Sequence, residues 1–311
     1  MKTTIDIIDS AILDAGEGSA CIAFSGGSDS LVLMDIIFKH TDHRPVVIFA
    51  NSQMEYPETE SFCQDVCGGY GAELYVAKAT RTPQEQWKKQ GWPMMGKLAA
   101  RKWMQRHKGG TLGFKIDVSS CCRNMKIAPA RKLAKKMGCS LQFTGTKGGA
   151  DDALRGLRAI KDSATHYVKT DKLTICNPLT GWTDTMIRRY HKKNDLLQHP
   201  AKGRGAITIG CVCCGGGSQF TNSGFKALRT TWHGGWLKYI VEMGMGEIIL
   251  AIKYDQHLDI VKEALKVMGG LEKVAQKRPW IFDYTAKTPR QGYDKRQRII
   301  HILKTCHLVI S

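Results

Sequence analysis

Apolar segments of strand length alternate with segments of helical spacing along the first third of the chain. Apolar runs of strand length lie at 20–24 and 45–50, and the segment 73–77 supplies the next strand. Apolar positions recur at roughly helical spacing in 3–15, and an apolar helix starts at 31–38. A proline and the acids after it open a further helix at 57–67. An uninterrupted apolar run suits a strand that is buried on both faces, as in a parallel sheet. The alternation predicts an α/β fold with a doubly wound, mostly parallel sheet.

The pattern changes further along the chain. Basic helical pieces are expected at 82–107 with a break near 91–93, a helix from Ile127, strands at 141–144 and 173–179, and a basic helix at 183–194 that Thr183 caps. After Gly217 the pattern favours helices at 223–243 and 258–275, with a strand at 247–252 between them. We therefore expect a sheet domain at 1–217 and a mostly helical C-terminal region at 218–311.

The first strand and the first long helix of the sheet are joined by a short turn of serine and glycine. The turn reads Ser25, Gly26, Gly27, Ser28, Asp29 and Ser30. Glycines let the backbone approach a phosphate closely, and the N–H groups at a helix start point toward it. Serine hydroxyls add donors, and a carboxylate beside phosphates suits Mg²⁺ or a charged partner. The segment predicts a phosphate cradle without the lysine of a Walker loop.

A second polar pair follows the apolar run at 45–50. Asn51 and Ser52 would stand at the carboxyl edge of that strand. Open α/β sheets bind ligands at this edge, so both residues are candidates for nucleotide contact.

The composition narrows the class of partner. Among 311 residues the formal net charge is +18, which favours an anionic partner such as a nucleotide, a nucleic acid or both; the alternative is a solvated basic surface. The basic groups gather at 101–107, 123–136, 188–193 and 287–304. No apolar run reaches the ~18 residues of a membrane span, and the N-terminus lacks a signal-peptide layout, so a cytoplasmic protein without membrane contact is expected.

Four of the 11 cysteines form a pattern that suits a metal site. Cys121 and Cys122 are adjacent, and Cys211 and Cys214 follow as a C-x-x-C turn, with Cys213 between them as a spacer or a fifth thiol. Four thiolates suit either Zn²⁺ or a [4Fe–4S] cluster, and the adjacent pair favours the cluster, because structural zinc sites usually pair two C-x-x-C turns. The other cysteines in apolar stretches are expected to be buried packing groups rather than disulfides.

These motifs resemble a known family. The Ser25–Ser30 turn resembles the SGGxDS loop of the PP-loop ATP pyrophosphatases, and the cysteine pattern resembles that of adenylylsulfate reductases within the phosphoadenylyl-sulfate (PAPS) reductase family. Further segments match that family in order at 50–59, 121–129, 156–163, 177–182 and 209–214. The resemblance covers roughly residues 15–220 and implies an adenine nucleotide alpha hydrolase-like fold.

The resemblance also implies roles for single residues. Arg158 in the segment GLRAIKDS would grip a phosphate or sulfate, and Lys126 would contact the ligand or offset the thiolate charge. Solvated side chains are the alternative for both. Cys306 stands near the C-terminus in Lys-Thr-Cys-His, which is similar to the tail that carries the reductases' nucleophilic cysteine but lacks its glycine. Cys306 is thus a nucleophile or a plain tail cysteine.

Two enzymatic functions follow from these features. In the first, the chain binds ATP and Mg²⁺ and adenylates a nucleic acid with release of pyrophosphate. Sulfur from a donor then replaces the adenylated oxygen, which gives either thiolation of tRNA or phosphorothioation of DNA. In the second, it is a sulfonucleotide reductase in which Cys306 attacks the substrate and a thioredoxin-like reductant completes the reaction. The intact loop and the charge favour the first function, and the cysteines favour the second. A nucleotide-sensing module that binds nucleic acid is a third alternative, and the sequence is compatible with a homo-oligomer.

Overall fold

The fold comprises two compact units in the described part of the chain. The computed structural model describes residues 1–16, 19–107, 112–117, 119–148, 164–215 and 224–283. The first unit consists of Met1–Thr82, Cys122–Gly203 and Thr208–Cys211; the second holds Pro83–Cys121, Arg204–Ile207 and the chain from Val212 onward. The structure thus groups residues 83–121 with the C-terminal helices, and the domain boundary expected at residue 217 stays a prediction.

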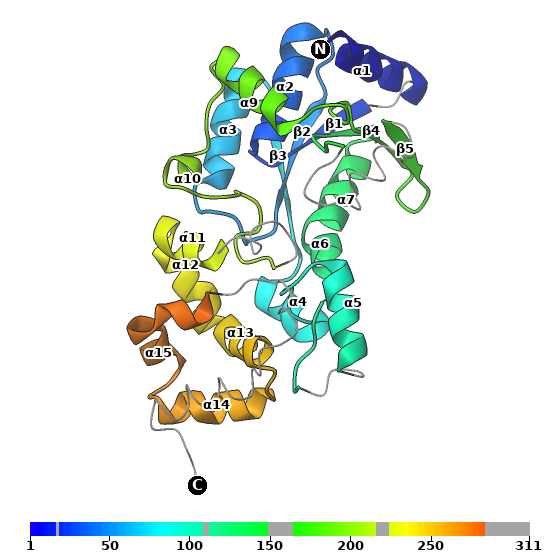
Figure 1. Cartoon of the computed structure of the whole chain (residues 1–311). Coiled ribbons are helices and arrows are strands. Elements are labelled where there is room, and N and C mark those ends of the chain that lie inside the picture. Colours follow the sequence, from blue (N-terminus) through cyan, green and yellow to red (C-terminus); the bar gives the residue numbers. More distant parts are fainter. Residues whose placement is uncertain (17–18, 108–111, 118, 149–163, 216–223, 284–311) are drawn as a thin grey trace. The chain divides into compact units, whose positions relative to one another are not determined.

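The first unit is built on a six-stranded sheet in the order β3-β2-β1-β4-β6-β5 (Figure 1). The strands are β1 (Ser19–Phe24), β2 (Val46–Asn51), β3 (Leu74–Lys78), β4 (Cys139–Thr144), β5 (Thr165–Val168) and β6 (Leu173–Cys176). All neighbours pair in parallel except β5, which pairs antiparallel with β6 at the edge. The mostly parallel, doubly wound α/β sheet expected from the sequence is confirmed. Strand β5 was missed, because its short stretch THYV carries no continuous apolar run.

Helices cover both faces of this sheet. One face packs against α1 (Lys2–Ala15), α2 (Ser28–His40), α3 (Thr59–Gly69) and α9 (Asp184–Lys193), and the other against α7 (Ala128–Lys136). Side chains of successive strand residues point to opposite faces, so in β1 Ile22 and Phe24 join the first core while Cys21 joins the second. Both faces of the sheet are therefore buried, which explains the unbroken apolar runs in the sequence.

A buried carboxylate ties three of these helices together. Asp35 of α2 is fully buried, and the hydroxyl of Tyr70, just after α3, donates to its Oδ1 at 2.5 Å. The hydroxyl of Tyr190 in α9 donates to its Oδ2 at 2.7 Å, and Lys39 pairs with it at 2.7 Å. Burial and the hydrogen bond to Asp35 raise the pKa of Tyr190, which keeps it a donor. Helix α9 is therefore held firmly on α2.

The second unit is helical in the described residues. Its helices are α4 (Pro83–Gln90), α5 (Lys97–Arg106), α11 (Gly224–Thr231), α12 (His233–Leu237), α13 (Met245–Tyr254), α14 (Leu258–Val267) and α15 (Leu271–Lys277). The strand expected at 247–252 is wrong: this run lies inside α13, whose residues 248–252 are all buried. A short apolar run reads alike in a buried strand and in a buried helix. The helix expected at 258–275 is interrupted at Gly269 and Gly270, which both have positive φ.

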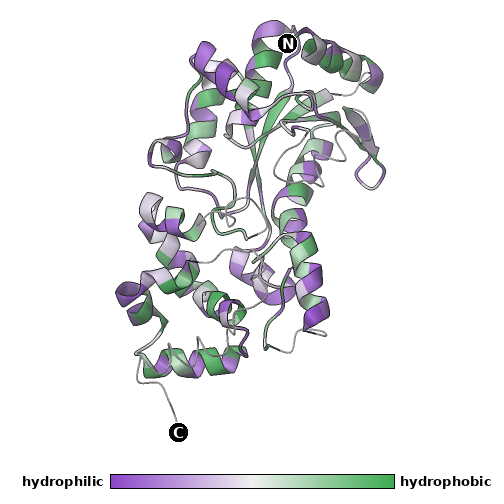
Figure 2. Ribbon diagram, viewed as in Figure 1, coloured by the Kyte–Doolittle hydropathy of each residue, from purple (hydrophilic) through white to green (hydrophobic). Residues whose placement is uncertain are grey.

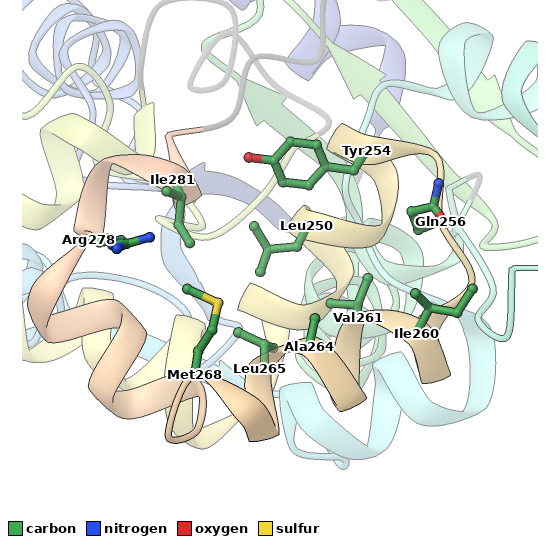
Figure 3. Close-up of a pocket in the computed structure, with 10 residues that line it drawn as sticks. All are labelled: Leu250, Tyr254, Gln256, Ile260, Val261, Ala264, Leu265, Met268, Arg278 and Ile281. Atoms are coloured by element: carbon green, nitrogen blue, oxygen red, sulfur yellow. The ribbon is translucent and has the colours of Figure 1, made fainter. Parts of the chain in front are cut away.

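An apolar pocket lies within the second unit, between α13, α14 and the 3₁₀ turn Pro279–Phe282. It is partly open to solvent and spans about 590 Å³. Figure 3 shows the side chains of Leu250, Leu265, Met268 and Ile281 converging on it. Its lining is almost entirely hydrocarbon.

Hydropathy follows the packing of both units. Figure 2 shows apolar colour along the inner sides of the sheet helices, whereas α9 is largely hydrophilic. Across the described ranges, none of the helices has the length and apolar character needed to traverse a lipid bilayer.

Candidate functional site

The candidate site lies where the direction of strand order reverses. The chain runs from β1 to β2 and β3 on one side and then returns to place β4 on the other side of β1. Ligands of open α/β sheets bind outside the carboxyl ends of the strands at such a point. Here the loop that follows β1 and the loop that follows β4 lie together: a Cβ built on Gly145 would stand 2.8 Å from the backbone nitrogen of Ser30. Only glycine permits this approach.

The turn after β1 depends on Gly26. This residue is buried and has φ of +71°, a conformation that residues with a Cβ rarely adopt. A Cβ at this position would also lie 3.0 Å from Sγ of Cys63 and 3.3 Å from Cδ1 of Phe62. Both backbone geometry and lack of space therefore require glycine, and the turn brings the start of α2 to the end of β1.

Serine hydroxyls hold the turn in shape. Ser30 is buried, and its hydroxyl donates to the carbonyl of Gly27 at 2.9 Å while it accepts the N–H of Ser25 at 3.3 Å. The hydroxyls of Ser25 and Ser30 lie 3.1 Å apart. Ser28 is exposed at the first position of α2, where the N–H groups of the first turn lack helical partners. The loop thus has the form of an anion cradle, and the hydrogen bonds of the buried Ser30 hydroxyl hold its backbone in place.

Asp29 is paired with Lys147, a residue that no motif in the sequence indicated as part of the site. Lys147 is 8% exposed, and its Nζ donates to Oδ1 of Asp29 at 3.0 Å and also to Oδ1 of Asp184. Although burial lowers the pKa of Lys147, both carboxylates raise it more, so the lysine stays charged. The same bond lowers the pKa of Asp184. Lys147 therefore joins the loop to the first residue of α9.

A small cavity opens beside the loop. It is partly open to solvent and spans about 210 Å³. Its lining residues are Gly26, Ser28, Leu31, His191, Leu197, Gln198, His199, Lys202 and Ile209. Burial lowers the pKa of Lys202, whereas the negative charge of Asp29 raises it. The ammonium group and the carboxylate therefore interact electrostatically. The exposed start of α2 and the nearby ammonium group suit an anionic group such as a phosphate.

His199 supports this cavity from within. It is 3% exposed, its Nε2 lies 3.1 Å from the hydroxyl of Thr59, and its Nδ1 accepts the N–H of Ala201 at 3.1 Å. The ring also packs edge-on against Phe62 at 5.0 Å between centroids. These contacts fix the turn that carries Lys202.

Asn51 and Ser52 stand at the end of β2, as expected, but their side chains bind neighbouring residues. The Nδ2 of Asn51 donates to Glu60 at 2.7 Å. Ser52 is fully buried, and its hydroxyl donates to Oε1 of Glu55 at 2.6 Å. The N–H groups of Ser52 and Met54 both donate to Oε2 of Glu55 at 3.1 Å. Glu55 is thus a buried carboxylate at the centre of this turn.

Lys126 pairs with this carboxylate. Its Nζ lies 3.1 Å from Oε1 of Glu55, and it belongs to a π-helical turn, Arg123–Ile127, of a kind often found at functional sites. Sγ of Cys211 lies 3.2 Å from the hydroxyl of Ser52. Burial lowers the pKa of Lys126, but the charges of Cys211, Glu55 and Cys122 together raise it. The structure thus brings two of the four predicted metal ligands near one ammonium group.

The four predicted metal ligands divide between the units. Cys122 and Cys211 belong to the first unit and are exposed and half-buried, respectively. Cys121 and Cys214 belong to the second, where the N–H of Cys121 donates to Asp117 at 3.1 Å. Within the described ranges, no three or more His, Cys, Asp or Glu side chains stand in an arrangement that would hold a metal ion.

The donor chemistry nevertheless suits a thiolate-bound group. Chain connectivity holds Cys121 next to Cys122 and keeps Cys214 within about 11 Å of Cys211. Lys126 would offset part of the thiolate charge. The tetrathiolate site stays a prediction.

Five of the remaining cysteines have the places expected for packing groups: Cys21, Cys63, Cys67, Cys139 and Cys176 are buried. Cys213 is buried too, and its role as a spacer or a fifth thiol stays a prediction. None of the cysteines in the described ranges forms a disulfide. Burial raises the pKa of Cys67 to about 12, which makes it unreactive at neutral pH.

Two predicted residues cannot be placed, and four useful ones were missed. Arg158 and Cys306 lie outside the described residues, so their roles stay predictions. The missed residues are Glu55, Lys147, His199 and Lys202. Glu55 stands inside the matched segment 50–59, so the family resemblance gave a local signal for it. The other three reach the loop only through long-range folding.

The family model and the relatives that match this chain point to the same family. A model described as the phosphoadenosine phosphosulfate reductase domain matches residues 19–216. A phosphoadenosine 5'-phosphosulfate reductase from Alkalilimnicola ehrlichii is 22% identical over 195 residues, which cover 63% of this chain and 69% of that one. An adenosine 5'-phosphosulfate reductase from Mycobacterium tuberculosis is 33% identical over 101 residues, covering 32% of this chain and 37% of the relative.

Solved structures give weaker matches. The phosphoadenylyl-sulfate reductase of Candida auris has a TM-score of 0.45 at 17% identity and covers 67% of this chain and 87% of that one. The U34-tRNA thiolase of Methanococcus maripaludis, solved with its [4Fe-4S] cluster, has a TM-score of 0.43 at 13% identity and covers 78% of each chain.

Proposed function

Since the chain belongs to the phosphoadenosine phosphosulfate reductase domain family, we propose that it is the kind of family enzyme that binds ATP at residues 25–30 and adenylates a nucleic acid for sulfur insertion. The observation that carries the proposal is the complete Ser-Gly-Gly-Ser-Asp-Ser loop. Its glycine turn, its helix start and the cavity beside it together provide a cradle for the phosphates of ATP.

The proposed reaction begins at the α-phosphorus of ATP. An oxygen of the acceptor attacks this atom, the bond to the β-phosphate oxygen breaks, and pyrophosphate leaves with both electrons of that bond. A hydrosulfide ion from a sulfur donor then attacks the adenylated position, the bond to the AMP oxygen breaks, and AMP leaves with both electrons of that bond. The cradle's N–H groups and Lys202 would bind the leaving pyrophosphate, since fixed donors aimed at developing charge supply much of catalysis.

Two further groups belong to this proposal. Asp29, held by Lys147, would position the phosphates directly or through Mg²⁺. Cys121, Cys122, Cys211 and Cys214 would hold a [4Fe–4S] cluster, which when bound supplies thiolate-ligated iron for sulfur delivery or for structure. Arg158 would grip a phosphate.

A pyrophosphate assay tests the function. With ATP and Mg²⁺ the purified chain should release pyrophosphate when transfer RNA or DNA is added, and little without it. If no nucleic acid elicits release and sulfite appears from adenylylsulfate or PAPS in the presence of a thiol, the proposal is wrong. Replacing Cys306 with serine serves as a control, because the adenylation route does not use this thiol.

The second candidate is a sulfonucleotide reductase. The two relatives described above carry the names of such enzymes, and Cys306 offers a nucleophile for a thiosulfonate that thioredoxin would resolve. In that case Cys306→Ser should abolish sulfite formation while pyrophosphate is never released.

The cluster has a separate test. Protein purified without oxygen should be brown, with broad visible absorbance and bound iron, and Cys211→Ser should lower the iron content. The matched control is Cys67→Ser, another thiol that lies outside the proposed ligand set and should leave the iron in place. A colourless protein that holds one zinc ion would contradict the cluster.

A further inference from the structure

Helix α9 has two faces of different character. Ile187, Tyr190 and His191 recur at helical spacing and face inward: Ile187 is buried, Tyr190 binds Asp35, and His191 lines the cavity beside the phosphate loop. This inner face attaches the helix to the nucleotide site.

The outer face consists of cations. Arg188, Arg189, Lys192 and Lys193 are all exposed and alternate with the inward positions, so they share the solvent side of the helix. The carboxylates of this segment neutralise them only in part, because the charge of Arg188 acts on Asp184 while none of the other three cations is paired with it. Asp184 is bound to Lys147, and Asp195 stands beyond the end of the helix.

Two sets of contacts hold α9 on the first unit, one at its first residue and one near its last turn. Lys147 joins Asp184, its first residue, to Asp29 of the loop, and Tyr190 joins its last turns to Asp35 of α2. The four cations are therefore carried on a helix that contributes His191 to the cavity beside the phosphate loop. Functional groups on rigid helices hold their positions more accurately than groups on loops.

We propose that the outer face of α9 is the docking surface for the phosphodiester backbone of the nucleic-acid acceptor. The argument is charge complementarity: an exposed band of four cations fits a polymer with regularly spaced negative charges. His191 on the inner face of the same helix lines the cavity proposed for the ATP phosphates, so a strand bound along the outer face of α9 would lie about one helix diameter, ~10 Å, from that cavity. The identity of the polymer as the acceptor rests on the proposed function.

The test compares two matched triple variants. The first is Arg189→Gln, Lys192→Gln and Lys193→Gln on α9. The second is Lys132→Gln, Lys135→Gln and Lys136→Gln, three exposed lysines of α7 on the opposite face of the sheet. Each set lowers the formal charge by the same amount, and glutamine preserves helix propensity. Binding is measured without ATP, by fluorescence anisotropy, to labelled single-stranded DNA, its duplex and a transfer RNA over a range of salt concentrations.

The α9 variant should bind at least one of these polymers about tenfold or more weakly than the wild type. The slope of log affinity against log salt should flatten by roughly two units, at ~0.7–0.9 per lost phosphate contact. The α7 variant should bind within about twofold of the wild type. Equal losses in both variants, or unchanged binding by the α9 variant, would overturn the proposal.

The outcomes separate this proposal from the enzymatic one. Binding that depends on α9 without pyrophosphate release would support the docking surface and refute the adenylation. Pyrophosphate release with no measurable binding of any polymer to the wild type would refute the docking surface. Competition with inorganic pyrophosphate distinguishes the phosphate cavity from the outer face of α9. Pyrophosphate should displace a nucleotide from the cavity but leave the polymer bound to α9. Displacement of the polymer by pyrophosphate at equal concentration would count against a separate surface.

Discussion

Asp29→Asn should reduce pyrophosphate release by about 100-fold or more, the size of effect seen when one stabilising group of a reacting centre is removed. The carboxylate stands in the phosphate loop, and asparagine preserves its shape without its charge. Lys147 retains Asp184 as a partner, so the variant should fold normally. ATP binding should change by only a few-fold, because the backbone cradle remains. Steady-state pyrophosphate release and nucleotide binding by calorimetry give the two values.

The matched control is Asp184→Asn. Asp184 binds the same lysine, but its side chain is 69% exposed and begins α9 rather than belonging to the loop. Its loss should lower the rate by only a few-fold. If the two variants are equally impaired, Asp29 acts only by holding Lys147. If Asp29→Asn keeps a third or more of the wild-type rate, the carboxylate has no part in the reaction.

Gly26→Ala should abolish nucleotide binding and destabilise the fold. A residue with a Cβ at φ of +71° costs ~1–2 kcal/mol, and the added carbon would press on Cys63 and Phe62 at 3.0 and 3.3 Å. The neighbours are buried core side chains, so the loop itself must move. Thermal unfolding and nucleotide binding measure the two consequences.

Gly71→Ala separates strain from crowding. Gly71 has nearly the same φ, +64°, yet a Cβ there would meet no atom within 4 Å. This control should lose ~1 kcal/mol of stability through backbone strain and keep normal nucleotide binding. Equal loss of stability in both variants would show that the space around Gly26 has no energetic effect, and unimpaired binding in Gly26→Ala would remove the loop from the nucleotide site.

Local signals in the sequence were sufficient for much of the fold. The strand, turn and helix around Ser25–Ser30 are confirmed, because apolar flanks and small residues carry that signal within one segment. Thr183 was expected to cap a helix, and its hydroxyl accepts the N–H of Met186 at 3.2 Å at the start of α9. The family resemblance found in the motifs is confirmed as well.

The rest depends on contacts that span the chain. Lys147 stands in a glycine-rich stretch and shows its role only when β4 brings it to Asp29. Lys202 lies near the loop because His199 anchors its turn to α3, and nothing in the local sequence indicates that contact. The helical state of residues 247–252 is likewise set by burial within the second unit, since the same apolar run would satisfy a strand.

The pairing of β1 with β4 has a consequence for how the chain folds. Ala20 pairs with Leu141, about 120 residues later, and Gly145 closes on Ser30 only after this pairing. Long loops must lose entropy before such contacts can form, which slows folding. During synthesis the first strand, its turn and its helix emerge long before β4 does. The phosphate cradle therefore has its local shape early but acquires Lys147, and with it a complete ion pair, only in a late and slow step of folding.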